Sequence, residues 1–134
     1  MTAPVERLVV DTSAVLACCL GEAGFEQFES ILTSSLKPMM SAASRLELGI
    51  VAMNRHIQPR VDEALQTYQI QIEPFTQAQA EMAIAAFAQY GKGRHPAALN
   101  FGDCCAYALA KSMNLPLLYK GNDFAQTDIT SALA

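Results

Sequence analysis

The stretch Arg7-Leu8-Val9-Val10-Asp11-Thr12-Ser13-Ala14 contains the transition that decides the fold. Its apolar run at 8–10 is typical of a buried β-strand, and the polar triplet that follows is typical of a helix start. Open α/β sheets bind their ligands at the carboxyl ends of their strands. The acid at position 11 is therefore predicted to lie where such a sheet builds a functional site.

Strands and helices are expected to alternate along the rest of the chain. Apolar residues at helical spacing, together with breakers such as Pro38, Gly91 and Pro116, set the expected bounds. We expect strands at 7–10, 39–40, 70–73 and 117–119, and helices at 12–20, 25–35, 42–54, 61–68, 76–90 and 101–113. Strands separated by helices imply crossover connections and a mostly parallel sheet covered on both faces. The predicted fold class is α/β, in a three-layer α/β/α arrangement.

Two of these helices carry more specific expectations. The longest one opens with Thr76, and Gln79 three residues later completes a capping-box pattern. The helix at 42–54 is apolar around its single acid. We expect its large apolar side chains to be mostly buried, namely Leu46, Leu48, Ile50, Val51 and Met53.

Length and composition indicate one domain over residues 1–134. The chain is 51% hydrophobic and 16% charged, which is too apolar for disorder and sufficient for one core. Its uncharged apolar stretches fall short of the roughly 18–20 residues of a membrane span. Residues 1–7 do not resemble a signal peptide. We therefore expect a cytoplasmic protein without a membrane partner.

The four cysteines form two adjacent pairs, Cys18-Cys19 and Cys104-Cys105, both in expected helices. We interpret them as small buried hydrophobic residues. A zinc site is the alternative, but the pairs lack the two-residue spacing of a zinc knuckle. Neighbours on a helix also point about 100° apart, which places them poorly for one ion.

Four carboxylates stand out from their surroundings, and each has an ordinary structural explanation. Asp11 is a good helix N-cap, and Glu47 fits one solvated position on an amphipathic helix. Asp103, early in a helix, interacts favourably with the helix dipole by about 0.3–1 kcal/mol. Asp123, in the sequence Gly121-Asn122-Asp123-Phe124, suits a turn or another N-cap.

Taken together, the four acids point to a metal site. Asp11 and Asp123 both follow strand ends, so the topology can bring them together. Carboxylates held close repel one another unless they bind protons or a cation. Oxygen-only ligands favour Mg²⁺ or Mn²⁺ over zinc. The formal net charge of −4 equals the charge of these four acids, so the rest of the chain is formally neutral. Contact with nucleic acid is therefore expected to be local and helped by a bound cation.

Other motifs are weaker. The stretch from Gly91 to Arg94 lacks the spacing of a phosphate-binding loop, and Ser13 lacks the His–Asp relay of a serine nucleophile. Both histidines are expected in solvated turns. Lys92, Arg94 and His95 share one loop that could contact a phosphate backbone. The competing interpretation is a basic loop that only keeps the surface soluble.

The chain resembles the PIN-domain proteins, and more narrowly the VapC-type toxins of bacterial toxin–antitoxin pairs. The resemblance covers about residues 7–130. Four segments carry it: Val9-Val10-Asp11-Thr12-Ser13-Ala14, Glu47 in an apolar helix, Asn100-Phe101-Gly102-Asp103-Cys104, and Lys120-Gly121-Asn122-Asp123-Phe124. The stretch 99–129, with Thr127-Asp128-Ile129, is the most characteristic.

The resemblance implies a Mg²⁺- or Mn²⁺-dependent endoribonuclease that works as a homodimer. Its acidic quartet falls on Asp11, Glu47, Asp103 and Asp123, and Ser13 is the residue that supports the first acid. Asn122 stands where many relatives have another acid, and Asn122 and Asp128 are weaker candidates for the shell. The family further implies an RNA substrate and a cognate antitoxin whose C-terminal tail covers the active site.

The expected reaction is hydrolysis of an RNA phosphodiester bond that leaves 5′-phosphate and 3′-hydroxyl ends. Asp11 and Asp103 are expected as direct metal ligands, with Glu47 and Asp123 completing the shell or orienting water. One rival interpretation is a catalytically weak or inactive PIN-like module that binds RNA or protein. Another is a phosphoacceptor receiver domain, but the strand at 70–73 ends in Glu73-Pro74, which serves that chemistry poorly.

Overall fold

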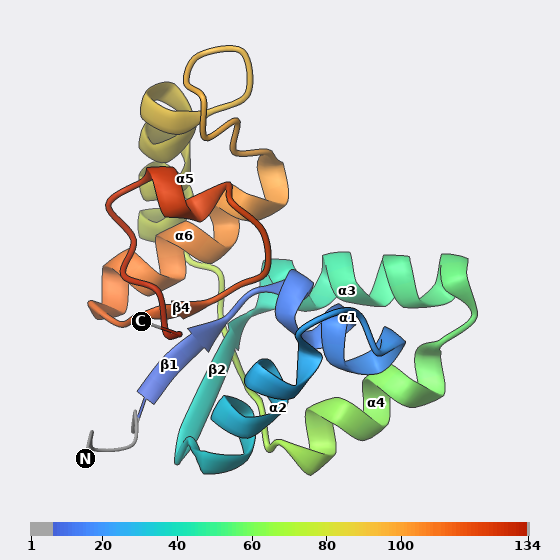
Figure 1. Ribbon diagram of the computed structural model, residues 1–134. Coiled ribbons are helices and arrows are strands. Elements are labelled where there is room, and N and C mark those ends of the chain that lie inside the picture. Colours follow the sequence, from blue (N-terminus) through green and yellow to red (C-terminus); the bar gives the residue numbers. More distant parts are fainter. Residues whose placement is uncertain (1–6, 134) are drawn as a thin grey trace.

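The strand before Asp11 is β1 (Arg7–Val10), and it lies inside a four-stranded parallel sheet (Figure 1). The computed structural model describes residues 7–133. The strand order is β3-β2-β1-β4, with β2 at Lys37–Ser41, β3 at Gln71–Glu73 and β4 at Leu117–Leu118. The chain leaves β1 toward β2 and β3 and then returns to place β4 on the opposite side of β1. The strand order therefore reverses between β1 and β4, where open α/β sheets bind ligands.

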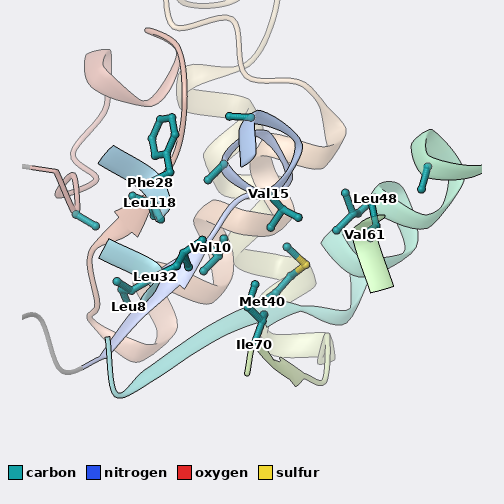
Figure 2. Close-up of a cluster of buried hydrophobic side chains, with 14 of the residues drawn as sticks. Leu8, Val10, Val15, Phe28, Leu32, Met40, Leu48, Val61, Ile70 and Leu118 are labelled. Atoms are coloured by element: carbon teal, nitrogen blue, oxygen red, sulfur yellow. The ribbon is translucent and has the colours of Figure 1, made fainter. Parts of the chain in front are cut away.

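Alternating side chains of β1 fill two cores, one on each face of the sheet. Leu8 and Val10 enter the core beneath α1 (Thr12–Leu20), α2 (Phe25–Ser34) and α4 (Gln58–Thr67), as Figure 2 shows. Val9 enters the core beneath α5 (Gln77–Tyr90) and α6 (Phe101–Met113). The predicted three-layer α/β/α fold is confirmed.

The helix α3 (Ala42–Arg55) joins the two sides, because it packs on α6 as well as on α1 and α4. Its inward residues are Ser44, Leu48 and Ala52, spaced four apart on one helix face. The prediction that the apolar residues of this helix are mostly buried is wrong for three of them. Their exposed fractions are 65% for Leu46, 51% for Ile50 and 60% for Met53, because these residues project from the outer face.

Most predicted bounds agree with the structure within one or two residues. The main difference is α4, which begins at Gln58 because Pro59 occupies its first turn, where a helix tolerates proline. Pro38 lies inside β2, near the strand start, instead of only preceding it. The Thr76 side chain caps α5 by accepting from the Gln79 amide at 3.2 Å.

The cysteines behave as helix side chains of the two cores. All four are free; Cys104 and Cys105 are buried, and Cys18 and Cys19 are half-buried. Burial raises the pKa of the Cys18 and Cys104 thiols to about 11, so these thiols are protonated and unreactive at neutral pH. Within residues 7–133, no helix combines the length and the apolar character needed to cross a membrane.

Candidate active site

Asp11 is fixed at the reversal point of the sheet. Its backbone amide donates to the Leu118 carbonyl of β4 at 2.9 Å, and its side chain caps α1. The carboxylate Oδ2 accepts from the Ser13 amide at 3.1 Å and from the Ser13 hydroxyl at 2.6 Å. The N-cap explanation of this acid is thus correct. It does not account for the burial, since Asp11 is only 5% exposed.

The Ser13 hydroxyl connects Asp11 to the segment after β4. It donates to Asp11 and accepts from the Lys120 amide at 3.0 Å. Lys120 begins the turn that carries Asn122 and Asp123, and its ammonium group pairs with Glu22 at 2.9 Å. Ser13 therefore holds two segments of the site, which lie 107 residues apart in sequence, in register.

Glu47 reaches the same region from α3 and lies against the start of α6. A Cβ atom added at Gly102 would collide with the Glu47 carboxylate, so the side chain of Glu47 can lie where it does only because residue 102 is glycine. The positive end of a helix dipole favours an acid at this place. Gly102 was not singled out from the sequence, although a glycine in the first turn of a helix is an intrinsically unfavourable choice and could have indicated it.

Asp103 lies in the first turn of α6 and closes a capping box with Asn100. Its amide donates to Asn100 Oδ1 at 2.8 Å, and its Oδ2 accepts from the Asn100 amide at 3.1 Å. The charges that act on its carboxyl group are those of Asp11, Asp123 and Glu47. The four predicted acids are therefore electrostatic neighbours.

The remaining predicted residues lie at the rim or outside. Asp123 and Asn122 are exposed in the turn before the short 3₁₀ helix at Phe124–Gln126. Asp128 has other partners: it accepts from the Tyr107 hydroxyl at 2.7 Å and pairs with Lys111 at 2.9 Å. Asp128 therefore anchors the C-terminal segment to α6.

The site holds negative charge that no basic side chain balances. The ion pairs among residues 7–133 are Arg45–Asp62, Lys111–Asp128 and Lys120–Glu22, none of which includes a member of the quartet. Burial raises the pKa of Asp11 to about 6. The hydrogen bonds from Ser13 lower this pKa, and the nearby charge of Glu47 raises it further. Burial, together with the other three acids, raises the pKa of Asp103 to about 7. Without a cation, both groups bind protons close to neutral pH.

The donor set fits a hard divalent cation in its chemistry, but its spacing is not preformed. Carboxylate oxygens without a cationic partner are suitable ligands for Mg²⁺ or Mn²⁺. Across residues 7–133, however, no three His, Cys, Asp or Glu side chains converge closely enough to chelate an ion as they stand. Any bound cation would have to draw the acids closer together than they lie here.

The basic loop between α5 and α6 is partly ordered by its own contacts. The Arg94 guanidinium lies 5.8 Å from the Phe87 ring centroid. His95 accepts from the Ala97 amide at 3.0 Å and stacks edge-on against Tyr90. His95 therefore lies in a turn, as expected, but it is half-buried instead of solvated. Lys92 and Arg94 are exposed on this loop.

Comparison with known proteins identifies relatives over almost the whole chain. The PIN domain matches residues 8–129. Ribonuclease VapC28 of Mycobacterium tuberculosis is 42% identical over 130 residues, covering 94% of this chain and 98% of the relative. Ribonuclease VapC42 of the same species is 41% identical over 129 residues, covering 93% of this chain and 98% of the relative.

Two solved structures are similar in fold. The crystal structure of Mycobacterium tuberculosis VapC20, described as a toxin that cleaves the sarcin-ricin loop, aligns with a TM-score of 0.73 at 17% identity, covering 92% of this chain and 96% of that one. A toxin–antitoxin complex from Klebsiella pneumoniae aligns with a TM-score of 0.67 at 23% identity, covering 90% of this chain and 92% of that one.

Proposed function

This chain belongs to the PIN-domain family as a VapC-type toxin endoribonuclease, and from that premise we propose that its acidic quartet holds the divalent cation of the reaction. The proposed ligands are Asp11, Glu47, Asp103 and Asp123. The observation that supports this assignment most strongly is the uncompensated charge at the sheet reversal point. The proposed cation is Mg²⁺ or Mn²⁺, because the donors are all carboxylate oxygens.

A bound cation supplies Lewis-acid stabilisation of the charge on the scissile phosphate and lowers the pKa of the attacking water. The protein supplies the contacts that position its proposed ligands. Asp11 is held by Ser13 from behind, as outer-shell partners commonly hold metal ligands. Asp103 is held by the capping box of α6, and Glu47 by the contact with Gly102. These contacts support three of the four proposed ligands, which come from three different segments, whereas Asp123 lies exposed at the rim.

The raised pKa values make cation binding depend on pH. A cation competes with the protons on Asp11 and Asp103, so its affinity should fall as the pH decreases through about 7 and then about 6. Cleavage is proposed to require the bound cation. RNA cleavage and cation binding should therefore weaken together in acid.

Cleavage of RNA in Mg²⁺ or Mn²⁺, and in EDTA, tests this proposal directly in the variants Asp11→Asn and Asp103→Asn. We expect EDTA to abolish cleavage. We expect each variant to cleave RNA at least about 100-fold more slowly than the wild type, which is more than the loss typical of outer-shell partners. The matched control is Asp62→Asn, an exposed acid of α4 that pairs with Arg45 outside the site. Undiminished cleavage in either site variant would show that the assignment is wrong.

The rival is a catalytically weak or inactive module that acts by binding RNA or protein. This rival is favoured by the finding that, among residues 7–133, no three acidic side chains lie close enough to chelate an ion as they stand. RNA binding that persists in EDTA, with no cleavage when Mn²⁺ is added, would support this rival. Cleavage that needs the cation and both acids would exclude it.

We also propose that the toxin pairs with a cognate antitoxin whose C-terminal tail covers the acids. The fold neighbour from Klebsiella pneumoniae is a toxin–antitoxin complex, which makes such a partner a natural expectation. Residues 1–134 are proposed to act as one PIN-like domain in the cytoplasm. Free cysteines are usual in such a reducing compartment.

The outer face of α3 supports a further part of the proposal, a homodimer. Leu46, Ile50 and Met53 form an exposed apolar stripe along that helix, and Ile84 and Phe101 are exposed on α5 and α6. Exposed apolar surface of this kind is typical of protein interfaces. Sedimentation of the wild type and of Ile50→Glu would test the stripe: the wild type should be a dimer, and the variant a folded monomer.

A further inference from the structure

Thr12 makes a buried hydrogen bond that the proposed chemistry does not yet use. Its hydroxyl, in the first turn of α1, donates to the Ser44 carbonyl of α3 at 3.3 Å. Thr12 is 6% exposed and Ser44 is 1% exposed. Threonine in a helix usually bonds within its own helix. Here the hydroxyl instead joins two helices whose residues lie 32 positions apart in sequence.

The two ends of this bond lie beside two members of the quartet. Thr12 follows Asp11 directly, and Ser44 is three residues before Glu47, which is about one helical turn. The charge of Glu47 acts on the carboxyl group of Asp11, so the two acids repel when both are ionised. The Thr12–Ser44 bond ties together the two backbone segments that this repulsion pushes apart.

We propose that Thr12 is a positioning residue that sets the separation of Asp11 from Glu47 and so tunes the affinity of the quartet for a divalent cation. This inference rests on the proposed function of the quartet. Thr12 itself donates its hydroxyl proton to a carbonyl group and is not proposed as a ligand. Ser13 holds Asp11 toward the segment after β4, and Thr12 would hold it toward α3.

An ordinary stabilising role makes different predictions from a positioning role. Ser44 lies within α3, where the amide four residues later can also donate to its carbonyl, so loss of Thr12 Oγ1 does not leave that acceptor unbonded. Valine has nearly the same shape as threonine and would keep the packing at this buried position. Thr12→Val should therefore retain the fold while it releases the link between the two acids.

Calorimetric titration of Mn²⁺ into RNA-free protein provides the test, with urea unfolding in EDTA as a parallel measurement. We expect Thr12→Val to bind Mn²⁺ about 10-fold more weakly than the wild type, as for loss of an outer-shell contact. Thr12→Ser keeps the hydroxyl and should bind almost as the wild type does. The control Ser112→Ala removes a hydroxyl that bonds within α6, to the Leu109 carbonyl, and should leave the affinity unchanged.

Unchanged Mn²⁺ affinity in Thr12→Val, with or without a loss of stability in EDTA, would overturn the inference. If Thr12→Val does not fold, the pair Thr12→Ala and Thr12→Ser replaces it, and equal affinities in that pair would have the same meaning. Asp11→Asn distinguishes the proposed metal site from the proposed role of Thr12. Wild-type protein that binds no Mn²⁺ would refute the proposed function together with this inference. Wild-type binding that Asp11→Asn abolishes and Thr12→Val leaves intact would refute only the role of Thr12.

Discussion

Removal of the charge of Asp11 should stabilise the cation-free protein at neutral pH. The pKa of this acid rises from 3.8 to about 6 on folding, chiefly because the carboxyl group is buried. Each pKa unit corresponds to about 1.4 kcal/mol, so the ionised form costs the folded state about 3 kcal/mol. An asparagine side chain at this position would keep an oxygen that accepts from Ser13, and Asp11→Asn therefore removes mainly the charge.

The sign of the pH dependence follows from the raised pKa. The folded state holds the proton more tightly than the unfolded state, so the stabilising contribution is complete below about pH 4 and is lost as the pH rises through about 6. Urea unfolding in EDTA should give similar midpoints for the wild type and Asp11→Asn near pH 4. At pH 8 the variant should be more stable by up to about 3 kcal/mol, which is roughly 1–3 M urea for common denaturant slopes.

Addition of Mn²⁺ at pH 8 should reverse the order of the two proteins. A cation at 1,000 times its dissociation constant stabilises the folded state by about 4.1 kcal/mol, which exceeds the deficit of about 3 kcal/mol, and this gain requires Asp11. Asp62→Asn, which removes an exposed charge outside the site, should have the same pH dependence of stability and the same response to Mn²⁺ as the wild type. The reasoning would be refuted if Asp11→Asn were no more stable than the wild type at pH 8 in EDTA.

Three further outcomes follow from contacts at and near the site. Ser13→Ala should lower RNA cleavage about 10–100-fold at limiting Mg²⁺, measured as initial rate, with partial recovery at high Mg²⁺. Gly102→Ala should displace Glu47 and reduce cleavage at least about 10-fold while circular dichroism stays unchanged. Burial alone would raise the pKa of Asp128, but its bonds to Lys111 and Tyr107 hold that pKa below its usual value. Asp128→Asn should therefore lower stability by about 1 kcal/mol in urea at pH 7, and the difference should shrink as the pH falls from about 4 through the lowered pKa of Asp128.

The sequence was most informative where the signal is local. The apolar run before Asp11 and the Thr76 cap each depend on residues within one turn, and β1 and α5 lie where they were expected. The acids could be placed together because a parallel sheet gathers its strand ends at one edge. The exact strand order, which makes that edge a reversal point, depends on contacts far apart in sequence and was not predictable.

Two differences between expectation and structure have a common physical cause. The outer stripe of α3 has the composition of a core, and periodicity identifies an apolar position without identifying what covers it. Asp128 was considered for the metal shell because it is close to Asp123 in sequence. Its actual partners, Tyr107 and Lys111, are 21 and 17 residues away, on a helix face that only the folded structure defines.

Anomalous diffraction from crystals grown with Mn²⁺ would test the central claim most directly. The account predicts a strong peak within about 2.0–2.3 Å of carboxylate oxygens from Asp11 and at least one other member of the quartet. The peak should be absent from Asp11→Asn crystals prepared in the same way. A peak at another position, or none in the wild type at saturating Mn²⁺, would contradict the claim that these acids form the metal site.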